Sequence, residues 1–148
     1  MSLPIILSAS AALEEANKVA LGISHAWDEP PEVLLDLPVS VRFAESTPQM
    51  HSSRLMGRYN IYNFKIEVHF PRGVLQEAVE LVLPVIRAYQ DLYTNNLSIS
   101  GTCDVSGFRE PACDGPLRLK YNDKTPETLG IIFYMFAKEI LDDITVNL

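Results

Sequence analysis

The segment 59–70, YNIYNFKIEVHF, alternates between apolar and polar side chains from Tyr62 to its end. Side chains at every second position lie on the same face of a β-strand, so this pattern predicts a strand that buries one face. A chain with such a strand has to supply a sheet and a second layer that covers it. We expect Tyr62, Phe64, Ile66, Val68 and Phe70 to point inward, and Asn63, Lys65, Glu67 and His69 to point outward.

The next segment, 74–93, spaces its apolar residues along one helical face and predicts a long helix as this second layer. Pro84 lies inside it and lacks a backbone N–H, so we expect a kink that costs about 3 kcal/mol unless packing compensates. Val79 and Leu83 fall away from the core face. Exposed apolar residues on a helix are more often without function, but with Pro84 these two mark a candidate subunit contact. The expected core residues are Val74, Leu75, Ala78, Leu81, Val82, Val85, Ile86, Tyr89 and Leu92.

A shorter helix is predicted over residues 10–21, with Ser8 or Ser10 capping its start and Gly22 its end. Helical spacing again defines one apolar face and one charged face. We expect Ala12, Leu13, Ala16, Val19, Ala20 and Ile23 to be buried, and Glu14, Glu15 and Lys18 to lie in water.

Four more strands are predicted, over residues 39–45, 97–105, 117–123 and 127–141. The first places Val39, Val41 and Phe43 on one face. The last is apolar on both faces between Ile131 and Ala137, which is typical of a central strand. Residues 46–58 are predicted to form a flexible loop, and residues 106–116 a connection rich in turns.

The predicted order is α-β-β-α-β-β-β, with short connections between the last three strands. Such connections favour antiparallel pairing with the helices on one face. We therefore predict an α+β fold, with a mixed, mainly antiparallel sheet of about five strands and two main helices packed on one face. Residues 1–148 are expected to form a single domain that includes a Pro-rich strap, 22–38, and the loop 46–58.

The formal net charge of -7 argues against a broad basic surface for nucleic acid. No apolar run approaches the ~18 residues that cross a bilayer, and the N-terminus lacks the basic region of a signal peptide. The two cysteines, Cys103 and Cys113, are then expected to be free thiols in a reducing compartment. Composition thus predicts a soluble, acidic protein without a membrane partner.

The strap contains His25 and four carboxylates between residues 28 and 36, which raises the question of a metal site. Metal ligands have to converge, whereas the Pro30–Pro31 step keeps the backbone extended and holds these groups apart. We therefore expect a solvated connecting segment that Trp27 and Leu34–Leu35 pin to the body or to a neighbouring subunit.

The other histidines, His51 and His69, have no partner at ligand spacing, and Cys103 and Cys113 supply half of a zinc site at best. The cysteines could oxidise across a turn, but small buried side chains are the expected outcome. The chain has neither a nucleophile elbow nor a Gly-rich phosphate loop. We expect no catalytic residue, metal or cofactor. A small-molecule-binding or enzymatic α+β domain that uses the acidic cluster or the cysteines stays as an alternative.

Four segments together carry a family resemblance. The first helix leads to LGISHAWDEPPEVLLDLPVSVRF, a Pro-rich approach to the first strand, and a long strand ends in KIEVHFPRG. The helix LQEAVELVLPVIRAYQDLY has a central Leu-Pro step, and a late strand reads TLGIIFYMFAKEI. This succession resembles the tail terminator and head–tail completion proteins of long-tailed bacteriophages. The likeness covers nearly all of the chain, whereas the acidic cluster and the two Cys-Asp pairs depart from it.

The resemblance implies a non-enzymatic virion protein that assembles in the bacterial cytoplasm into a homo-oligomeric ring, typically a hexamer. Such a ring caps the head-proximal end of the tail tube and joins it to the head connector; a head-side neck or stopper role is the alternative. The implied partners are the tail tube protein and the connector or stopper protein, with the tape-measure protein as a further candidate. DNA would pass through an acidic lumen without specific binding. The candidate interface residues are Trp27, Met50, Arg54, Leu55, Met56, Arg58, Val79 and Leu83.

Overall fold

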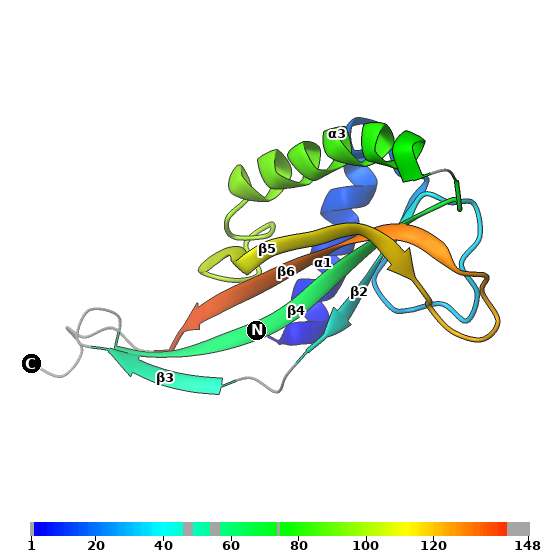
Figure 1. Cartoon of the computed structure of the whole chain (residues 1–148). Helices are drawn as coiled ribbons and strands as arrows, with labels where there is room; N and C mark the ends of the chain where they lie inside the picture. Colours follow the sequence, from blue (N-terminus) through cyan, green and yellow to red (C-terminus); the bar gives the residue numbers. More distant parts are fainter. Residues whose placement is uncertain (1, 46–48, 54–56, 74, 142–148) are drawn as a thin grey trace, which may run out of the picture.

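A computed structural model describes residues 2–45, 49–53, 57–73 and 75–141. The chain forms three helices and six strands within these residues (Figure 1). The helices are α1 (Leu3–Ala16), α2 (Lys18–Leu21) and α3 (Leu75–Thr94). The strands are β1 (His25–Trp27), β2 (Val39–Ala44), β3 (Gln49–Ser53), β4 (Gly57–Phe70), β5 (Val105–Leu119) and β6 (Thr128–Ile140).

All six strands belong to one sheet, with the order β1-β2-β4-β6-β5. β1 runs parallel to β2, and the other pairs are antiparallel. β2 and β3 pair with successive parts of the same edge of β4, residues 64–69 and 57–61. β6 lies between β4 and β5, which confirms the central position predicted for residues 127–141. The predicted α+β class, with its mainly antiparallel sheet, is confirmed.

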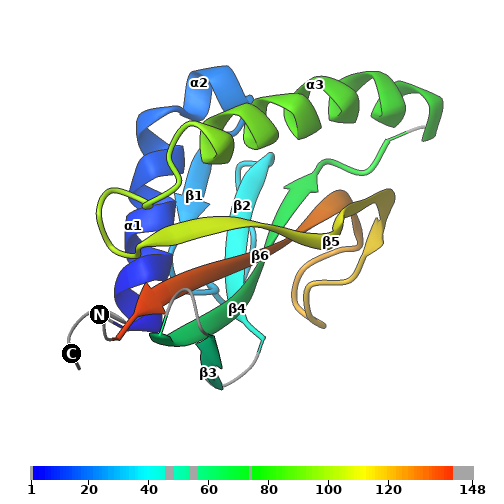
Figure 2. The same cartoon turned by 90° about the vertical axis from the view of Figure 1, so that its left-hand side faces the viewer.

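The main core lies between the sheet and the two long helices, α1 and α3 (Figure 2). All five inward residues predicted for 62–70 are buried, and their pairing partners on β6 are buried with them. Tyr89 of α3 stacks on Phe133 of β6 with the ring centres 4.8 Å apart. α1 reaches the same core through Ile6, which is fully buried. Both helices therefore cover one face of the sheet, as predicted.

The first helix differs from its prediction in position and in orientation. It begins at Leu3 rather than near residue 10, follows Ser2 rather than Ser8 or Ser10, and ends at Ala16. Gly22, with φ 74°, ends the short α2 as expected. Val19, predicted to be buried, is 91% exposed. The buried residues of α1 are Ile6, Ser10, Ala11 and Glu14, so the helix buries two polar residues, Ser10 and Glu14, for which the core supplies partners.

Three other predictions about elements are wrong. Residues 49–53, inside the predicted loop 46–58, form β3, which makes a hairpin with the start of β4. Residues 97–105, predicted as a strand, mostly form turns before β5. The predicted turn region 106–116 lies within β5, an edge strand whose register shifts after Phe108 and Asp114 accommodate two prolines. Leu81 of α3, predicted to be in the core, is 61% exposed.

Candidate functional site

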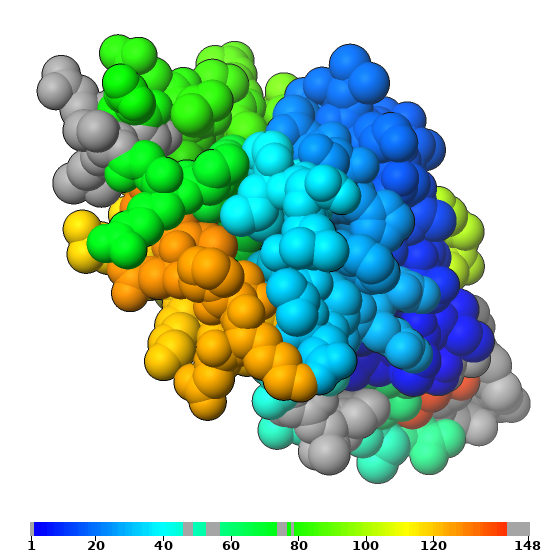
Figure 3. All heavy atoms as spheres, turned by 90° about the vertical axis from the view of Figure 1, so that its right-hand side faces the viewer, coloured from blue at the N-terminus to red at the C-terminus, as the bar shows by residue number. Residues whose placement is uncertain are grey.

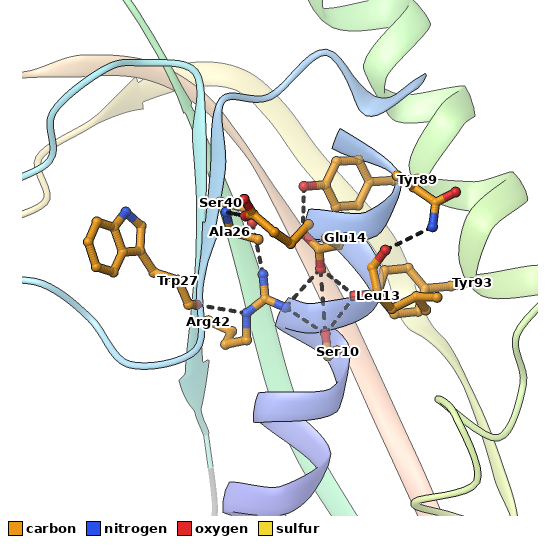
Figure 4. Close-up of polar contacts among 11 residues, drawn as sticks. Ser10, Leu13, Glu14, Ala26, Trp27, Ser40, Arg42, Tyr89 and Tyr93 are labelled. Atoms are coloured by element: carbon orange, nitrogen blue, oxygen red, sulfur yellow. Dashed lines mark hydrogen bonds and ion pairs between the residues drawn. The ribbon is translucent and has the colours of Figure 1, made fainter. Parts of the chain in front are cut away.

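A buried polar network around Arg42 fixes the position of the helices on the sheet (Figure 4). β2 points the Arg42 side chain toward the helix layer, where it is fully buried. One terminal nitrogen, Nη1, donates to Ser10 Oγ at 2.7 Å and to Glu14 Oε2 at 2.9 Å. Nε donates to the carbonyl of Trp27 at 3.0 Å, and Nη2 donates to Ser40 Oγ at 2.8 Å. The guanidinium thus binds α1, β1 and β2 together.

Two tyrosines of α3 complete the network from the opposite side. The Tyr89 hydroxyl donates to Glu14 Oε1 at 2.6 Å, and the Tyr93 hydroxyl donates to Glu14 Oε2. Burial is the main cause that raises the pKa of both hydroxyls well above its ordinary value, and the nearby carboxylate of Glu14 is the second. Both tyrosines therefore stay protonated and act as donors. Burial alone lowers the pKa of Arg42, but Glu14 and both tyrosines outweigh it and raise the pKa overall.

The network joins parts of the protein and presents no free group to a ligand. The partners of Arg42 and Glu14 all come from the chain itself, and both side chains are closed to solvent. The sequence prediction placed Glu14 in water and did not involve Arg42, so it missed this cluster. One signal was available: Ile6, Ser10 and Glu14 follow one another at a spacing of four residues, on one helical face.

The strap packs on the opposite face of the sheet and forms a second, smaller core. Leu34 is buried there against Val39 and Val41, and Trp27 and Tyr121 pack around them. Trp27 is half-buried within its own subunit, where its ring meets His25 edge-on with centres 4.4 Å apart. The prediction that Trp27 and Leu34 pin the strap to the body therefore agrees with the structure, whereas Leu35 is 67% exposed. A contact of Trp27 with a neighbouring subunit stays a prediction.

The polar side chains of the strap do not share a common partner. His25 Nδ1 lies 2.9 Å from Glu15 Oε2, on α1. Glu32 forms a salt bridge with Lys124, whereas Asp28 and Glu29 are exposed. Within the described parts of the chain, no group of three or more His, Cys, Asp or Glu residues could hold a metal ion.

Two residues predicted to face water, Glu67 and His69, are instead buried beside the second core. His69 Nε2 lies 2.9 Å from Glu67 Oε1, and Lys65 Nζ lies 3.0 Å from Glu67 Oε2. Burial raises the pKa of Glu67, but the hydrogen bonds from His69 and Lys65 outweigh it and the pKa is lowered. The Tyr121 ring covers His69 edge-on at 5.8 Å between centres. The alternation in residues 62–70 correctly placed Glu67 and His69 on the face away from the helices. It did not predict that the strap and the loop with Tyr121 cover this face.

The cysteines are free thiols. Cys103 is buried in the turn before β5, and burial with the nearby Asp104 raises its pKa to about 11. Cys113 lies on β5, half-buried against the main core, and burial raises its pKa as well. Both thiols are therefore protonated at neutral pH, which disfavours nucleophilic chemistry.

The back of α3 is apolar and exposed, as the helical spacing predicted. Leu83 is 57% exposed and Val79 is 38% exposed, and the two are four residues apart and therefore neighbours on one side of the helix. Exposed apolar side chains that lie together are typical of a contact surface. We refer to Val79 and Leu83 as the α3 back.

At the end of the sheet farthest from the strap, β3 and the first residues of β4 form a projecting arm, Gln49–Ser53 and Gly57–Ile61 (Figure 1). Met50 on the arm is 65% exposed, and Arg58 is exposed as well. The other loop residues in the predicted interface, Arg54, Leu55 and Met56, lie outside the described residues.

Among the described residues, none covers the sheet face turned away from the helices beside the arm. A hollow of about 390 Å³ lies over four neighbouring strands there. Lys138 Nζ lies 5.5 Å from the ring centre of Phe136 and 5.4 Å from that of Tyr59. The guanidinium of Arg109 lies 5.5 Å from the ring centre of Tyr134. The hollow is lined by Gln49, His51, Ile61, Asn63, Arg109, Phe136 and Lys138.

This hollow combines an apolar floor with a cationic rim, and the sequence did not predict it. Its residues come from β3, β4, β5 and β6, so only the pairing of the strands brings them together. Such a surface suits a partner that carries both apolar and acidic groups.

In the part of the chain that the structure describes, no helix is long and apolar enough to cross a membrane. Comparison of the chain with models of known protein families and with curated proteins gave no match.

Proposed function

We propose that this protein is a structural ring subunit of a long-tailed bacteriophage, a tail terminator that caps the head-proximal end of the tail tube and joins it to the head connector. The supporting observation is the open hollow beside the arm. Apolar side chains such as Ile61 and Phe136 lie only half-buried on this face, although the strap covers the same face at its other end. Covering this surface with another subunit would bury the exposed apolar area.

Two further features support assembly as opposed to chemistry at a cleft. The α3 back offers an apolar contact on a different side of the molecule, and the arm projects beyond the body. Two different surfaces on one subunit suit heterologous contacts, from which closed rings are built. The mechanism is then physical: one face of the ring copies the contacts of a tube subunit, and the other gives the next tube subunit nothing to bind.

The test is the effect of removing the protein from the phage that encodes it. Tails that lack it are expected to have overlong or uneven tubes in negative-stain images, and added protein should form rings at tube ends. Tails of normal length that join heads normally would refute the terminator role. Protein bound to the portal complex, with bare tube ends, would assign the head-side neck or stopper role instead.

A further inference from the structure

We propose that the tip of the strap, Asp28–Glu32, of one subunit binds in the hollow beside the arm of a second copy of this chain. We call these five residues the strap tip. The inference rests on the proposed self-assembly into a ring and identifies the two surfaces that meet between neighbours.

Of the two cations at the hollow, Arg109 forms a salt bridge with Glu45, whereas Lys138 has no such partner among the described residues. Lys138 contacts two aromatic rings, and none of the described carboxylates lies within salt-bridge distance of its ammonium. Arg109 is shared between Glu45, the carbonyl of Met135 and the ring of Tyr134. In a chain with a net charge of -7, this rim is an exception that suits an acidic partner.

The strap tip has the complementary chemistry. Asp28 and Glu29 are exposed, and neither forms a salt bridge with any described residue. Between them and Glu32 lie two prolines, whose rings and extended backbone suit a surface lined by aromatic residues. Of these acidic groups, Glu32 alone has a cationic partner in the described chain, Lys124.

The strap tip is also held in place before any partner binds. The Tyr121 hydroxyl donates to the carbonyl of Pro31, and Asn122 Nδ2 donates to the carbonyl of Glu32 at 2.6 Å. A segment that is already ordered loses little conformational entropy when it docks. Figure 3 shows the strap, in blue to cyan, as a continuous part of the surface between α1 and the loop 120–127.

The two surfaces lie where a head-to-tail contact needs them. Figure 1 shows the arm at one end of the sheet and the strap toward the other. Lys138 pairs with Ile61 of the arm, whereas residues 28–30 line a groove with Phe43 and Ala44 of β2, so the proposed contact between the strap tip and Lys138 joins two copies. Such a contact is heterologous, and it closes into a ring when the rotation per subunit divides a full turn.

A charge exchange tests the contact in the full chain. Lys138→Glu and, separately, Asp28→Lys with Glu29→Lys should each lower the self-association constant by about tenfold or more. The variant that carries all three substitutions should regain self-association, because every interface again joins opposite charges. Sedimentation over a concentration series measures the constants, and circular dichroism checks folding.

Lys18→Glu is the matched control for Lys138→Glu, since it changes the net charge equally at a partly exposed lysine on α2. Asp91→Lys with Asp123→Lys is the control for the strap pair.

The outcomes separate this contact from the proposed function. Self-association that neither charge reversal weakens, or that the combined variant does not regain, overturns the contact while rings at tube ends still support the terminator role. A wild-type chain that stays monomeric at every concentration overturns the contact too. Binding of single-stranded DNA, lost in Lys138→Glu while self-association is unchanged, would assign the hollow to nucleic acid.

Discussion

Arg42 shows how a charged side chain is accommodated in the centre of this core. Taking a guanidinium and a carboxylate out of water costs several kcal/mol per ion, which their mutual attraction offsets only when hydrogen bonds satisfy the remaining groups. Here Ser10, Ser40 and the carbonyl of Trp27 satisfy Arg42, and two tyrosines satisfy Glu14. The network therefore specifies how α1, β2 and α3 fit together more than it adds stability.

Replacing one partner of the Arg42–Glu14 pair should lower the free energy of unfolding far more than replacing both. We expect Arg42→Met to lower the free energy of unfolding by about 3–5 kcal/mol, because Glu14 is left buried without its cation. The double variant Arg42→Met, Glu14→Gln should recover a large part of this loss. Urea unfolding of both variants measures the difference. Arg118→Met, at an exposed arginine, is the control and should change stability by less than about 0.5 kcal/mol. Equal losses in the single and double variants would contradict the coupling.

The sequence predicted apolar burial better than polar burial. All five inward residues of 62–70 are buried, because a period of two leaves one arrangement for a strand with a covered face. Glu14 and His69 were placed in water, since a charged residue is seldom buried unless a partner compensates. Those partners, Arg42 and the loop with Tyr121, are far away in the chain and become neighbours only in the fold.

At the scale of elements, adjacent residues of α3 lie on different faces of the helix. Val82 is fully buried in the main core, and Leu83 is 57% exposed on the α3 back. The helical spacing predicted both positions correctly. It was wrong for Leu81, which is 61% exposed and borders a hollow between α3, α2 and the end of β4.

Leu83→Glu is expected to weaken ring formation while changing the free energy of unfolding by less than about 0.5 kcal/mol, as exposed substitutions do. Val82→Glu is the contrast, since a carboxylate buried without a partner should prevent stable folding. Thermal unfolding and the fraction of rings in negative-stain images measure the two effects. An equal loss of folding and assembly in Leu83→Glu would place this residue in the core.

β3 and most of β5 were missed for a common reason, although the predicted strand 117–123 overlaps the end of β5. Polar residues dominate β3, and prolines interrupt β5, so neither shows the alternation of a half-buried strand. Each pairs along an edge of a neighbour whose own pattern is strong, β4 for β3 and β6 for β5. The hollow depends on both, which is why its residues could not be grouped from the sequence.

At the scale of the whole molecule, the body and the arm should differ in local stability. The helices cover β4 in the body, where Ile66 and Val68 are fully buried, whereas the side chains of residues 49–52 in β3 are exposed. Amide hydrogens of residues 49–53 should therefore exchange faster than those of residues 64–69 in the isolated subunit. They should slow down when rings form. Hydrogen exchange followed by mass spectrometry measures this, and equal protection of both segments in the isolated subunit would contradict it.

β4 and β6 run from the body into the arm without interruption and therefore connect the two ends of the molecule. A β-strand rises about 3.3 Å per residue, close to the maximum that a polypeptide can reach. Because the backbone of these two strands is already almost fully extended, tension between the two ends can lengthen the subunit very little. In the proposed assembly, any lengthening would therefore occur at the contacts between subunits and not within them.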